Sequence, residues 1–322
     1  MLRIMRVAGV LPALLAGAIA SAFAQTYPAR PVRLVVPFPA GGSNDIVGRV
    51  VATELGDRLG KQVIVDNRVG GNSIIGTEIV ANAQPDGYTL LVISTSFTTN
   101  PIIHKLPFDP LKSFAWVAML GVGPNVLVVN PSLPVSSVQE LIALARAKPG
   151  QLVYASTGVG SNGHFGMELF KHMTGTNILH VPYKGGPPAL IDTVGGQVQM
   201  TLGSLIQTTS FIRSGKLRAL AVSSAARSSI LPNVPTIGEA GVPGYQTANW
   251  WGVAAPRGTP PAIVNRLNQD IKVVLQSPDT EKRFVNEGAE PQTKTPGELG
   301  KYVADEMGKW VELARIAGIR GE

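Results

Sequence analysis

The stretch VRLVVPFPAGGSNDIVGRV, residues 32–50, decides the fold of this chain, because an apolar segment runs through two glycines into a polar segment. This order of features predicts a strand, a tight loop and a helix. Gly41 and Gly42 allow the loop backbone to approach a ligand without interference from Cβ atoms. The free N–H groups and the positive dipole end of the helix favour an anion, so the junction is predicted to bind a carboxylate or a phosphate.

A second stretch of the same kind lies downstream. LVYASTGVGSNGHFGMELF, residues 152–170, again passes from a strand through Gly158, Gly160 and Gly163 into a helix. Each stretch offers a backbone cradle for an anion. Two cradles in one chain predict a clamp that holds a ligand from two sides.

Residues 1–24 have the features of a secretory signal peptide. Arg3 and Arg6 form a basic region, residues 7–20 are apolar apart from Gly and Pro, and the A-x-A motif that ends at Ala24 is a cleavage site. The apolar run is shorter than the ~20 residues that a transmembrane helix needs. We therefore expect cleavage after Ala24 and a location in the periplasm.

Composition sets limits on the chemistry. The chain has 322 residues and no cysteine, which leaves room for two domains and excludes thiol nucleophiles and Cys-ligated metals. A core of this size needs no disulfides. Removal of Arg3 and Arg6 lowers the formal net charge from +7 to +5. The remaining Lys and Arg are scattered without a basic run, which excludes nucleic acid as a partner and leaves a general attraction for small anions.

Predicted strands and helices alternate through most of the chain, which is typical of an α/β fold with parallel sheets. A capping box is predicted at Thr295–Glu298. The predicted strands are 32–38, 62–67, 89–96, 152–156, 178–183, 198–204 and 217–224. The predicted helices are 44–59, 73–83, 163–173, 187–194, a short helix between 204 and 217, 260–275, 280–287 and 296–316.

Two further apolar stretches stand outside this alternation, NVLVVN at 125–130 and NWWGVAAP at 249–256. We interpret them as hinge strands. If they pair antiparallel, residues 125–252 form one inserted lobe, lobe II, and residues 25–124 join residues 253–322 in the other, lobe I. A two-strand hinge allows rigid-body closure of the lobes around a ligand.

The chain also resembles a known family over nearly its whole length after residue 24. The motifs that carry the resemblance are YPARPVRLVVPFPAGGSNDIVGR, VIVDNRVGGNSIIGTEIVANAQPDGYTLL, YASTGVGSNGHFG, HVPYKGGPPAL, GKLRALAVSSAAR, LPNVPTIGEAG and WWGVAAPRGTP. In order and spacing they are similar to the extracytoplasmic solute-binding proteins of the tripartite tricarboxylate transporter family, the Bug proteins. The resemblance implies a type II periplasmic binding protein fold, with two α/β lobes and the ligand cleft between them. It also implies a small carboxylated solute and membrane transporter subunits as partners. We expect a monomer without a cofactor or a metal.

By this resemblance, the first loop contacts a ligand carboxylate through backbone N–H groups and ordered water. Ala40 stands where the family usually has a second proline, and Ser43 or Asn44 is the predicted N-cap of the helix. Asp45 has two interpretations: it orders the loop and its water, which we favour, or it contacts the ligand directly. The matching positions are Phe38, Ala40, Gly41, Gly42, Ser43 and Asp45.

The second loop and the carboxyl ends of the other strands complete the predicted site, because open α/β sheets bind ligands at those ends. Lys184 is interpreted as a solvated surface lysine, with attraction of the ligand charge as the alternative. The second loop supplies Ser156, Thr157, Gly158, Ser161, Asn162 and His164, and the other segments supply Ser94, Thr95, Tyr183 and Ser204.

Enzymatic motifs are weak or missing. Neither glycine loop ends in the Gly-Lys-Ser or Gly-Lys-Thr of a nucleotide-binding loop, and GVGSNG at 158–163 has no acidic residue at the end of the next predicted strand. Ser161 lacks the preceding glycine of a nucleophile elbow, since Val159 stands there. The four histidines form no metal-binding pattern. A solute receptor is the main hypothesis, and an exported enzyme for a similar acid or the input protein of a sensor are the alternatives.

Overall fold

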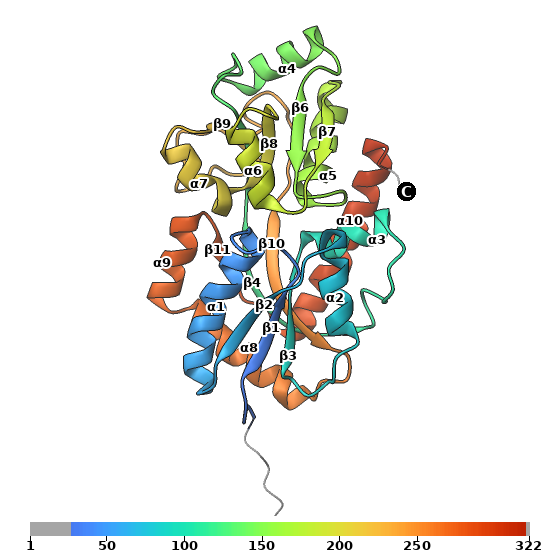
Figure 1. The fold of residues 1–322 in the computed structure, drawn as a ribbon, viewed down its shortest axis with the longest axis vertical. Coiled ribbons are helices and arrows are strands. Elements are labelled where there is room, and N and C mark those ends of the chain that lie inside the picture. The colour runs from blue at the N-terminus through green and yellow to red at the C-terminus, as the bar shows by residue number, and fades with distance from the viewer. Residues whose placement is uncertain (1–26, 320–322) are drawn as a thin grey trace, which may run out of the picture.

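The computed structural model describes residues 27–319, so the predicted signal peptide lies outside the described residues. The chain forms two α/β lobes, stacked along the long axis of the molecule (Figure 1). Lobe I, below, contains a six-stranded sheet, and lobe II, above, contains a five-stranded sheet. Between residues 27 and 319, no helix combines the length and the apolar character that crossing a bilayer requires.

The sheet of lobe I has the strand order β11-β4-β10-β3-β1-β2. Strand β1 pairs in parallel with β2 and β3, whereas β10 runs antiparallel to β3 and β4. The mixed sheet places the carboxyl ends of β1 and β3 at the edge that faces lobe II (Figure 1). The strands are β1 Val32–Val36, β2 Val63–Asn67, β3 Thr89–Ser94, β4 Phe114–Gly123, β10 Asn249–Pro256 and β11 Glu290–Pro291.

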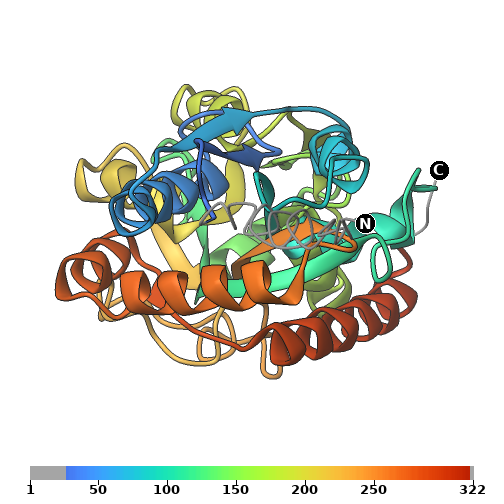
Figure 2. The same ribbon diagram turned by 90° about the horizontal axis from the view of Figure 1, so that it is seen from below.

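Helices cover both faces of this sheet because side chains alternate along each strand. Leu34 and Val36 of β1 pack with helices α1 and α8, whereas Val35 packs with α2 and α10 on the other face. The two helical layers flank the sheet in Figure 2. The helices are α1 Ser43–Leu59, the 3₁₀ turn Gly71–Ser73, α2 Ile74–Ala81, α3 Thr95–Ile103, α8 Pro261–Leu275, α9 Pro278–Glu287 and α10 Pro296–Ala317.

Lobe II repeats the plan with the strand order β7-β6-β8-β5-β9. Leu127 and Val129 of β5 pack with α4 and α5, and Val126 and Val128 pack with α6 and α7. The strands are β5 Asn125–Val129, β6 Val153–Ser156, β7 Leu179–Pro182, β8 Met200–Ser204 and β9 Arg218–Val222. The helices are α4 Val138–Ala147, α5 Asn162–Thr174, α6 Gly186–Val194 and α7 Leu205–Arg213.

The predicted pairing of the two hinge strands is wrong. Strand β5 pairs with β8 and β9 in lobe II, and β10 pairs with β3 and β4 in lobe I. The partner that the sequence analysis overlooked is β4, which pairs with β10 along its whole length, Asn249 opposite Gly123. Each apolar stretch is therefore a fully buried central strand of its own sheet, and the two chain crossings lie side by side next to residues 123 and 249.

Most predicted elements are present, with shifted ends. The prediction of a strand over 89–96 is wrong at its end, because β3 stops at Ser94 and Thr95 begins α3. The capping box is confirmed: the Glu298 backbone N–H donates to the Thr295 hydroxyl, and the Thr295 backbone N–H donates to the Glu298 carboxylate. Helices α3 and α4 were not predicted, and α3 proves important for the site.

Candidate functional site

A polar cavity, here called the inner cavity, lies between the lobes and is formed by residues of both. Its volume is about 40 Å³. Its lining is largely buried, since Ser43, Ser94, Asn162 and Asn249 are all less than 9% exposed. The lining residues are Phe38, Pro39, Gly42, Ser43, Asn44, Ser94, Ser96, Asn125, Thr157, Asn162, Gly163, Gly186, Leu202, Ser204, Gln207 and Asn249.

Five helices begin at this cavity, namely α1 and α3 from lobe I and α5, α6 and α7 from lobe II. The first-turn or N-cap residues of each belong to the lining, such as Gly42 of α1, Ser94 of α3 and Gly186 of α6. Only α5 has a side-chain cap, because the Ser161 hydroxyl accepts from the His164 backbone N–H. The other four helix starts lack a side-chain cap. In α7 the Leu205 N–H donates to the Pro124 carbonyl, and in α6 Pro187 and Pro188 have no N–H, so the N–H groups offered to an anion come mainly from α1 and α3.

The predicted N-cap of α1 is wrong. Gly42 occupies that position, and Ser43 and Asn44 are the first two residues of the helix itself. Gly41 has φ of +76°, which allows the chain to turn sharply before the helix. Without a capping side chain, the start of α1 presents backbone N–H groups, and Ser43 and Asn44 of its first turn line the cavity.

Asp45 orders the first loop. Its Oδ2 accepts from the Gly41 N–H at 2.9 Å and from Arg49 Nε at 2.9 Å, and its Oδ1 accepts from Asn67 Nδ2 at 2.9 Å. Asn67 Nδ2 also donates to the Phe38 carbonyl, which fixes the other end of the loop. Burial alone would raise the pKa of the Asp45 carboxyl, but hydrogen bonds from Arg49, Gly41 and Asn67 hold this pKa below its ordinary value. Asp45 lies outside the cavity lining, and its geometry agrees with the loop-ordering interpretation.

Three buried polar atoms that line or adjoin the cavity have no hydrogen-bond partner within the protein. They are Asn44 Oδ1, Ser204 Oγ and Gln207 Nε2. Buried polar atoms are normally paired, because an unpaired one loses its hydrogen bonds to water without a replacement. All three belong to lining residues, one from lobe I and two from lobe II. The cavity is therefore equipped for a polar ligand that touches both lobes.

Two stacked histidines, His164 and His180, contact the second loop through hydrogen bonds. The Gly160 N–H donates to His164 Nδ1 at 3.2 Å, and the Ser156 hydroxyl hydrogen-bonds His180 Nε2 at 2.6 Å. The two imidazole rings stack with centroids 4.3 Å apart. Burial lowers the pKa of His164, and burial together with the neighbouring His164 and Lys171 lowers the pKa of His180 to about 3. Both rings are therefore neutral and support the loop rather than face the cavity.

Ser156 and His180 do not form a nucleophile and base that reach the inner cavity. Ser156 is 1% exposed and lies outside the cavity lining, although its hydroxyl contacts His180. A histidine with a pKa of about 3 is a poor general base near neutral pH. Among the described residues, no group of His, Asp and Glu side chains is arranged to hold a metal ion.

The predicted site residues fall into three groups. Phe38, Gly42, Ser43, Ser94, Thr157, Asn162 and Ser204 line the inner cavity. Gly158 and Tyr183 line a second, outer cavity of about 600 Å³, which adjoins the inner one at Phe38, Pro39 and Thr157 and also includes Lys184. Ala40, Gly41, Asp45, Thr95, Ser156, Ser161 and His164 line neither cavity.

Several residues of the last group act in the support of the site. Thr95 Oγ1 donates to Asn249 Oδ1 at 2.9 Å and so ties α3 to β10. Ala40 is exposed at the tip of the first loop.

Sequence reasoning missed the residues contributed by the chain crossings and by α6 and α7. Asn125 and Asn249 each begin a central strand, and Asn125 Nδ2 donates to Asn162 Oδ1 inside the cavity. A polar residue at the start of a fully apolar strand was the available signal. For Gln207 the sequence contained no such signal, because this residue lies within helix α7 and enters the cavity only through the packing of the two lobes.

Comparisons with known proteins agree with this architecture. The family model of the tripartite tricarboxylate transporter family receptor matches residues 47–319. Protein BugT of Bordetella pertussis is 41% identical over 99% of both chains. The structure of R. palustris Rpa4515 with adipate has a TM-score of 0.91 at 40% identity and covers 92% of this chain and 100% of that one. MatC (Rpa3494) from Rhodopseudomonas palustris with bound malate has a TM-score of 0.85 at 31% identity, with 89% and 99% covered.

These likenesses confirm the predicted two-lobed periplasmic binding protein fold. The family resemblance that the sequence motifs predicted is confirmed by the family model and by relatives over nearly the whole chain. The chain belongs to the tripartite tricarboxylate transporter receptor family, a family of solute-binding proteins.

Proposed function

We propose that this protein is a periplasmic receptor that captures a small carboxylated organic solute and delivers it to a tripartite tricarboxylate-type membrane transporter. The observation that carries the proposal is the convergence of five helix N-termini on one cavity that also contains buried, unpaired polar atoms of Asn44 and Ser204. Helix N-termini stabilise anions in sites that contain no cationic side chain. The relatives solved with adipate and with malate support a carboxylate as the ligand.

Capture by lobe closure is the proposed mechanism. Both crossings between the lobes lie next to the cavity, at residues 123–125 and 247–249. Because β10 begins at Asn249 in the sheet of lobe I, the second boundary moves from the predicted residue 252 to residue 249. Rotation of the two lobes about these two segments opens the cavity to solvent. Contacts between the lobes hold the cavity closed: among them, the Thr99 hydroxyl donates to the Gly160 carbonyl, and Phe165 packs edge-on against Trp310.

Export and delivery complete the proposal. The signal features of residues 1–24 support cleavage after Ala24 and a periplasmic site of action. Delivery to a membrane transporter rests on family membership. The protein binds without turnover in this proposal, because the cavity lining contains no residue with the properties of a general base.

A thermal-shift screen of carboxylic acids on the protein without residues 1–24 tests the proposal. Binding of a carboxylate to the closed form is expected to raise the melting temperature, by mass action on the folded state. Product analysis after prolonged incubation with each acid that binds is expected to return that acid unchanged. Stabilisation by no carboxylate, or measurable turnover, would contradict the proposed receptor function.

A further inference from the structure

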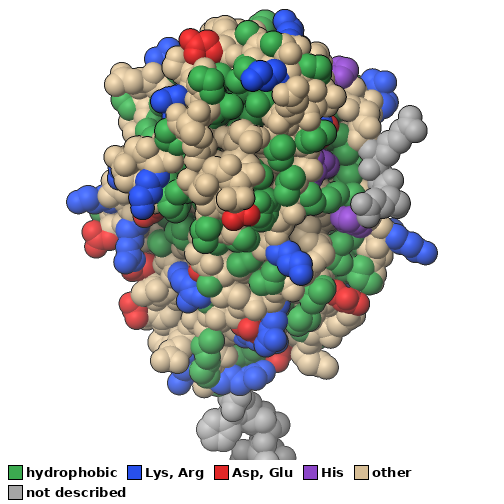
Figure 3. All heavy atoms as spheres, turned by 45° about the horizontal axis from the view of Figure 1, so that its top comes forward, with side chains coloured by type: hydrophobic (Ala, Val, Ile, Leu, Met, Phe, Trp, Pro, Cys, Tyr) green, Lys and Arg blue, Asp and Glu red, His purple; other side chains and the backbone are tan. Residues whose placement is uncertain are grey.

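Uncharged groups make the contacts between the two lobes. With the boundary at residue 249, none of the salt bridges between residues 27 and 319 joins lobe I to lobe II. On the face drawn in Figure 3, basic and acidic side chains are interspersed over the surface. In the same part of the chain, the bond from the Thr99 hydroxyl to the Gly160 carbonyl is the only side-chain hydrogen bond between the lobes. Lobe closure therefore depends on neutral groups, and Thr99 shows where they meet.

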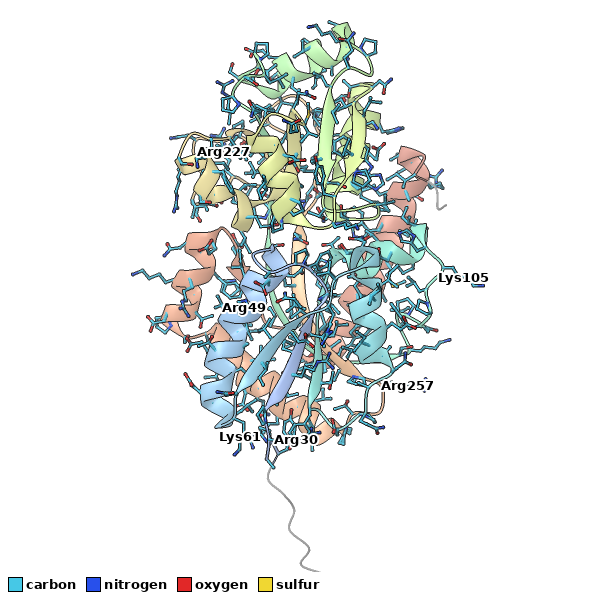
Figure 4. All side chains as sticks on the ribbon, viewed as in Figure 1. Arg30, Arg49, Lys61, Lys105, Arg227 and Arg257 are labelled. Carbon is cyan, nitrogen blue, oxygen red and sulfur yellow. The ribbon has the colours of Figure 1, made fainter. Side chains whose placement is uncertain are left out.

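Helix α3 provides the lobe I side of this contact. It begins at the inner cavity and runs toward Lys105, whose side chain points out into solvent in Figure 4. Thr99 and Asn100 stand next to each other on the helix and are 0% and 2% exposed. On the lobe II side, Gly160 belongs to the loop that carries Thr157 into the inner cavity. The contact therefore connects a helix that begins at the cavity with a loop that lines it.

Asn100 is paired with Asn72, which lies in the segment Gly70–Ser73 of lobe I. Asn72 Nδ2 donates to Asn100 Oδ1 at 2.9 Å, and Asn100 Nδ2 donates to the Asn72 carbonyl at 2.7 Å. Asn100 Nδ2 also donates to the Ser73 hydroxyl at 3.2 Å. The Ser96 hydroxyl donates to Asn72 Oδ1 at 3.4 Å. These bonds hold the two amide groups together as one unit on the surface of lobe I that faces lobe II.

The backbone that carries Asn72 is strained. Asn72 has φ of +45° and Ser73 has φ of +85°, and they are the two non-glycine residues with positive φ between residues 27 and 319. Left-handed conformations of this kind are costly for a residue with a Cβ atom and persist only where the surroundings enforce them. Here the hydrogen bonds from Asn100 to both residues enforce them. The strained backbone directs the Asn72 amide toward lobe II.

The amide pair lies against the second glycine loop. A methyl group on the Gly160 Cα would stand 3.2 Å from both Asn72 Nδ2 and Asn100 Oδ1. A methyl group on the Gly158 Cα would stand 3.5 Å from Asn72 Oδ1. The two glycines have φ of +139° at residue 158 and +82° at residue 160, so the loop adopts a shape that a rigid neighbour can hold in place. The amides of lobe I therefore provide a surface on which this loop rests when the lobes are closed.

From this geometry, we propose that Asn72, held in place by Asn100, is a positioning residue for ligand capture. Together with Thr99 it stabilises the closed state by holding the second glycine loop, and it sets the affinity for every ligand without selecting among them. The inference rests on the proposed receptor function and goes beyond it. None of these three residues lines the inner cavity. Asn72 does line the outer cavity, so the test separates stabilisation of the closed state from direct contact with a ligand.

Asn72→Gly tests the inference, because glycine adopts φ of +45° without strain while the amide is lost. In the protein without residues 1–24, relief of strain offsets the lost hydrogen bonds, so the melting temperature without ligand is expected to change by less than about 3 °C. Calorimetry measures the dissociation constants for succinate, glutarate, adipate and malate. All measurable constants are expected to rise by one common factor of at least about fivefold, because closure then buries an unpaired oxygen of Asn100.

Asn82→Gly is the matched control, at the exposed end of α2 in the same lobe, and is expected to leave the constants unchanged. Factors that differ among the acids would show that Asn72 contacts the ligand and would overturn the inference. Unchanged constants in Asn72→Gly would overturn it as well, and both results leave the receptor function intact. If no carboxylate of the thermal-shift screen binds to the unaltered protein, the receptor function fails and this inference fails with it.

Thr99→Val provides a second variant that keeps the volume of the side chain and removes the hydrogen bond to Gly160. It is expected to raise all measurable constants by one common factor of at least about fivefold, since closure leaves the Gly160 carbonyl unpaired. Thr98→Val is its control, because the equally buried Thr98 hydroxyl donates to the Thr95 carbonyl of its own helix. Equal effects of the two valine substitutions would overturn the role of the contact between the lobes.

Closure itself is measured by the distance between two spin labels. The chain has no cysteine, so Ile64→Cys in lobe I and Ile191→Cys in lobe II, both at exposed positions, provide the two labelling sites. At one fixed concentration of the acid that binds most tightly, the closed fraction is expected to be smaller in Asn72→Gly than in the protein with Asn72. A closed fraction that Asn72→Gly does not alter would overturn the inference.

Discussion

Pro39 of lobe I and Gly185 of lobe II lie against each other between the inner and outer cavities. A methyl group on the Gly185 Cα would stand 2.6 Å from Pro39 Cγ, which is closer than two carbon atoms approach in folded proteins. Gly185 also has φ of +110°, a backbone conformation that disfavours every other residue. This pair therefore links a loop of each lobe at a point where closure leaves no space.

Gly185→Ala is accordingly expected to hinder closure and weaken binding of the best carboxylate from the screen. An overpacked contact typically costs about 1–3 kcal/mol, which corresponds to a loss of affinity of roughly 5- to 150-fold. Calorimetry measures the affinity, and small-angle scattering measures whether the ligand still compacts the protein.

Pro39→Ala in the Gly185→Ala background separates the two causes. Removal of Pro39 Cγ relieves the contact between lobes but not the strain at φ of +110°. Recovery of affinity in the double variant identifies the contact as the cause. If the double variant binds as poorly as Gly185→Ala alone, the backbone strain is responsible and the closure argument fails.

Asp45→Ala is expected to disorder the first loop. The substitution removes the acceptor for the Gly41 N–H and for Asn67, and it leaves Arg49 without its partner. Hydrogen bonds to a charged group contribute about 1.5–3 kcal/mol each, so denaturant unfolding should show a loss of that order, with weaker carboxylate binding.

Asp57→Ala provides the control for this prediction, because Asp57 is exposed near the end of the same helix. It is expected to change neither stability nor affinity by more than about 0.5 kcal/mol. Equal effects of the two substitutions would show that Asp45 acts only through the net charge of the helix.

His164 is expected to act through its acceptor nitrogen. His164→Leu introduces an apolar side chain of similar length, which leaves the buried Gly160 N–H unpaired. The expected cost is about 1–3 kcal/mol in unfolding free energy. His164→Asn places a side-chain oxygen near the former position of Nδ1 and should recover most of this loss. Calorimetric affinity for the carboxylate should follow the same order, since the loop carries Thr157 into the cavity. Equal losses in both variants would contradict the role of the acceptor.

Acid is expected to destabilise the protein through His180. The pKa of His180 is about 3 in the folded protein and 6.5 in its ordinary state, so the unfolded chain binds a proton that the folded chain does not. Stability is therefore complete above pH 6.5 and falls as the pH drops from there toward 3. One such histidine contributes a slope of about 1.4 kcal/mol per pH unit.

Urea unfolding at several pH values between 7.5 and 4.5 measures that slope. His180→Gln should reduce it by the contribution of one proton, whereas His172→Gln, at an exposed position on α5, should leave it unchanged. A slope that His180→Gln does not alter would show that His180 is already charged in the folded state.

The sequence by itself determined most of the local elements, including the two junctions of strand, glycine loop and helix. Strand β1, the glycine turn and α1 follow from residues within a few positions of one another, as does the capping box of α10, because their causes are backbone freedom, periodicity and capping. The family also follows from sequence, since its motifs are co-linear. Central strands were harder: β4 was overlooked, and β5 and β10 were paired wrongly, because uniformly apolar strands contain no signal for their partner.

Only the tertiary structure decided which of the predicted residues line the inner cavity. In the sequence, Asp45 and His164 belong to the two glycine-rich stretches. In the structure, however, the Asp45 carboxylate accepts hydrogen bonds from Gly41, Arg49 and Asn67, and the His164 imidazole accepts from the Gly160 N–H. Gln207 and Asn249 enter the cavity from segments that are distant in the chain. The physical reason is that a helix N-terminus is a local property, whereas the direction of a side chain and the meeting of five such ends depend on how two lobes pack against each other.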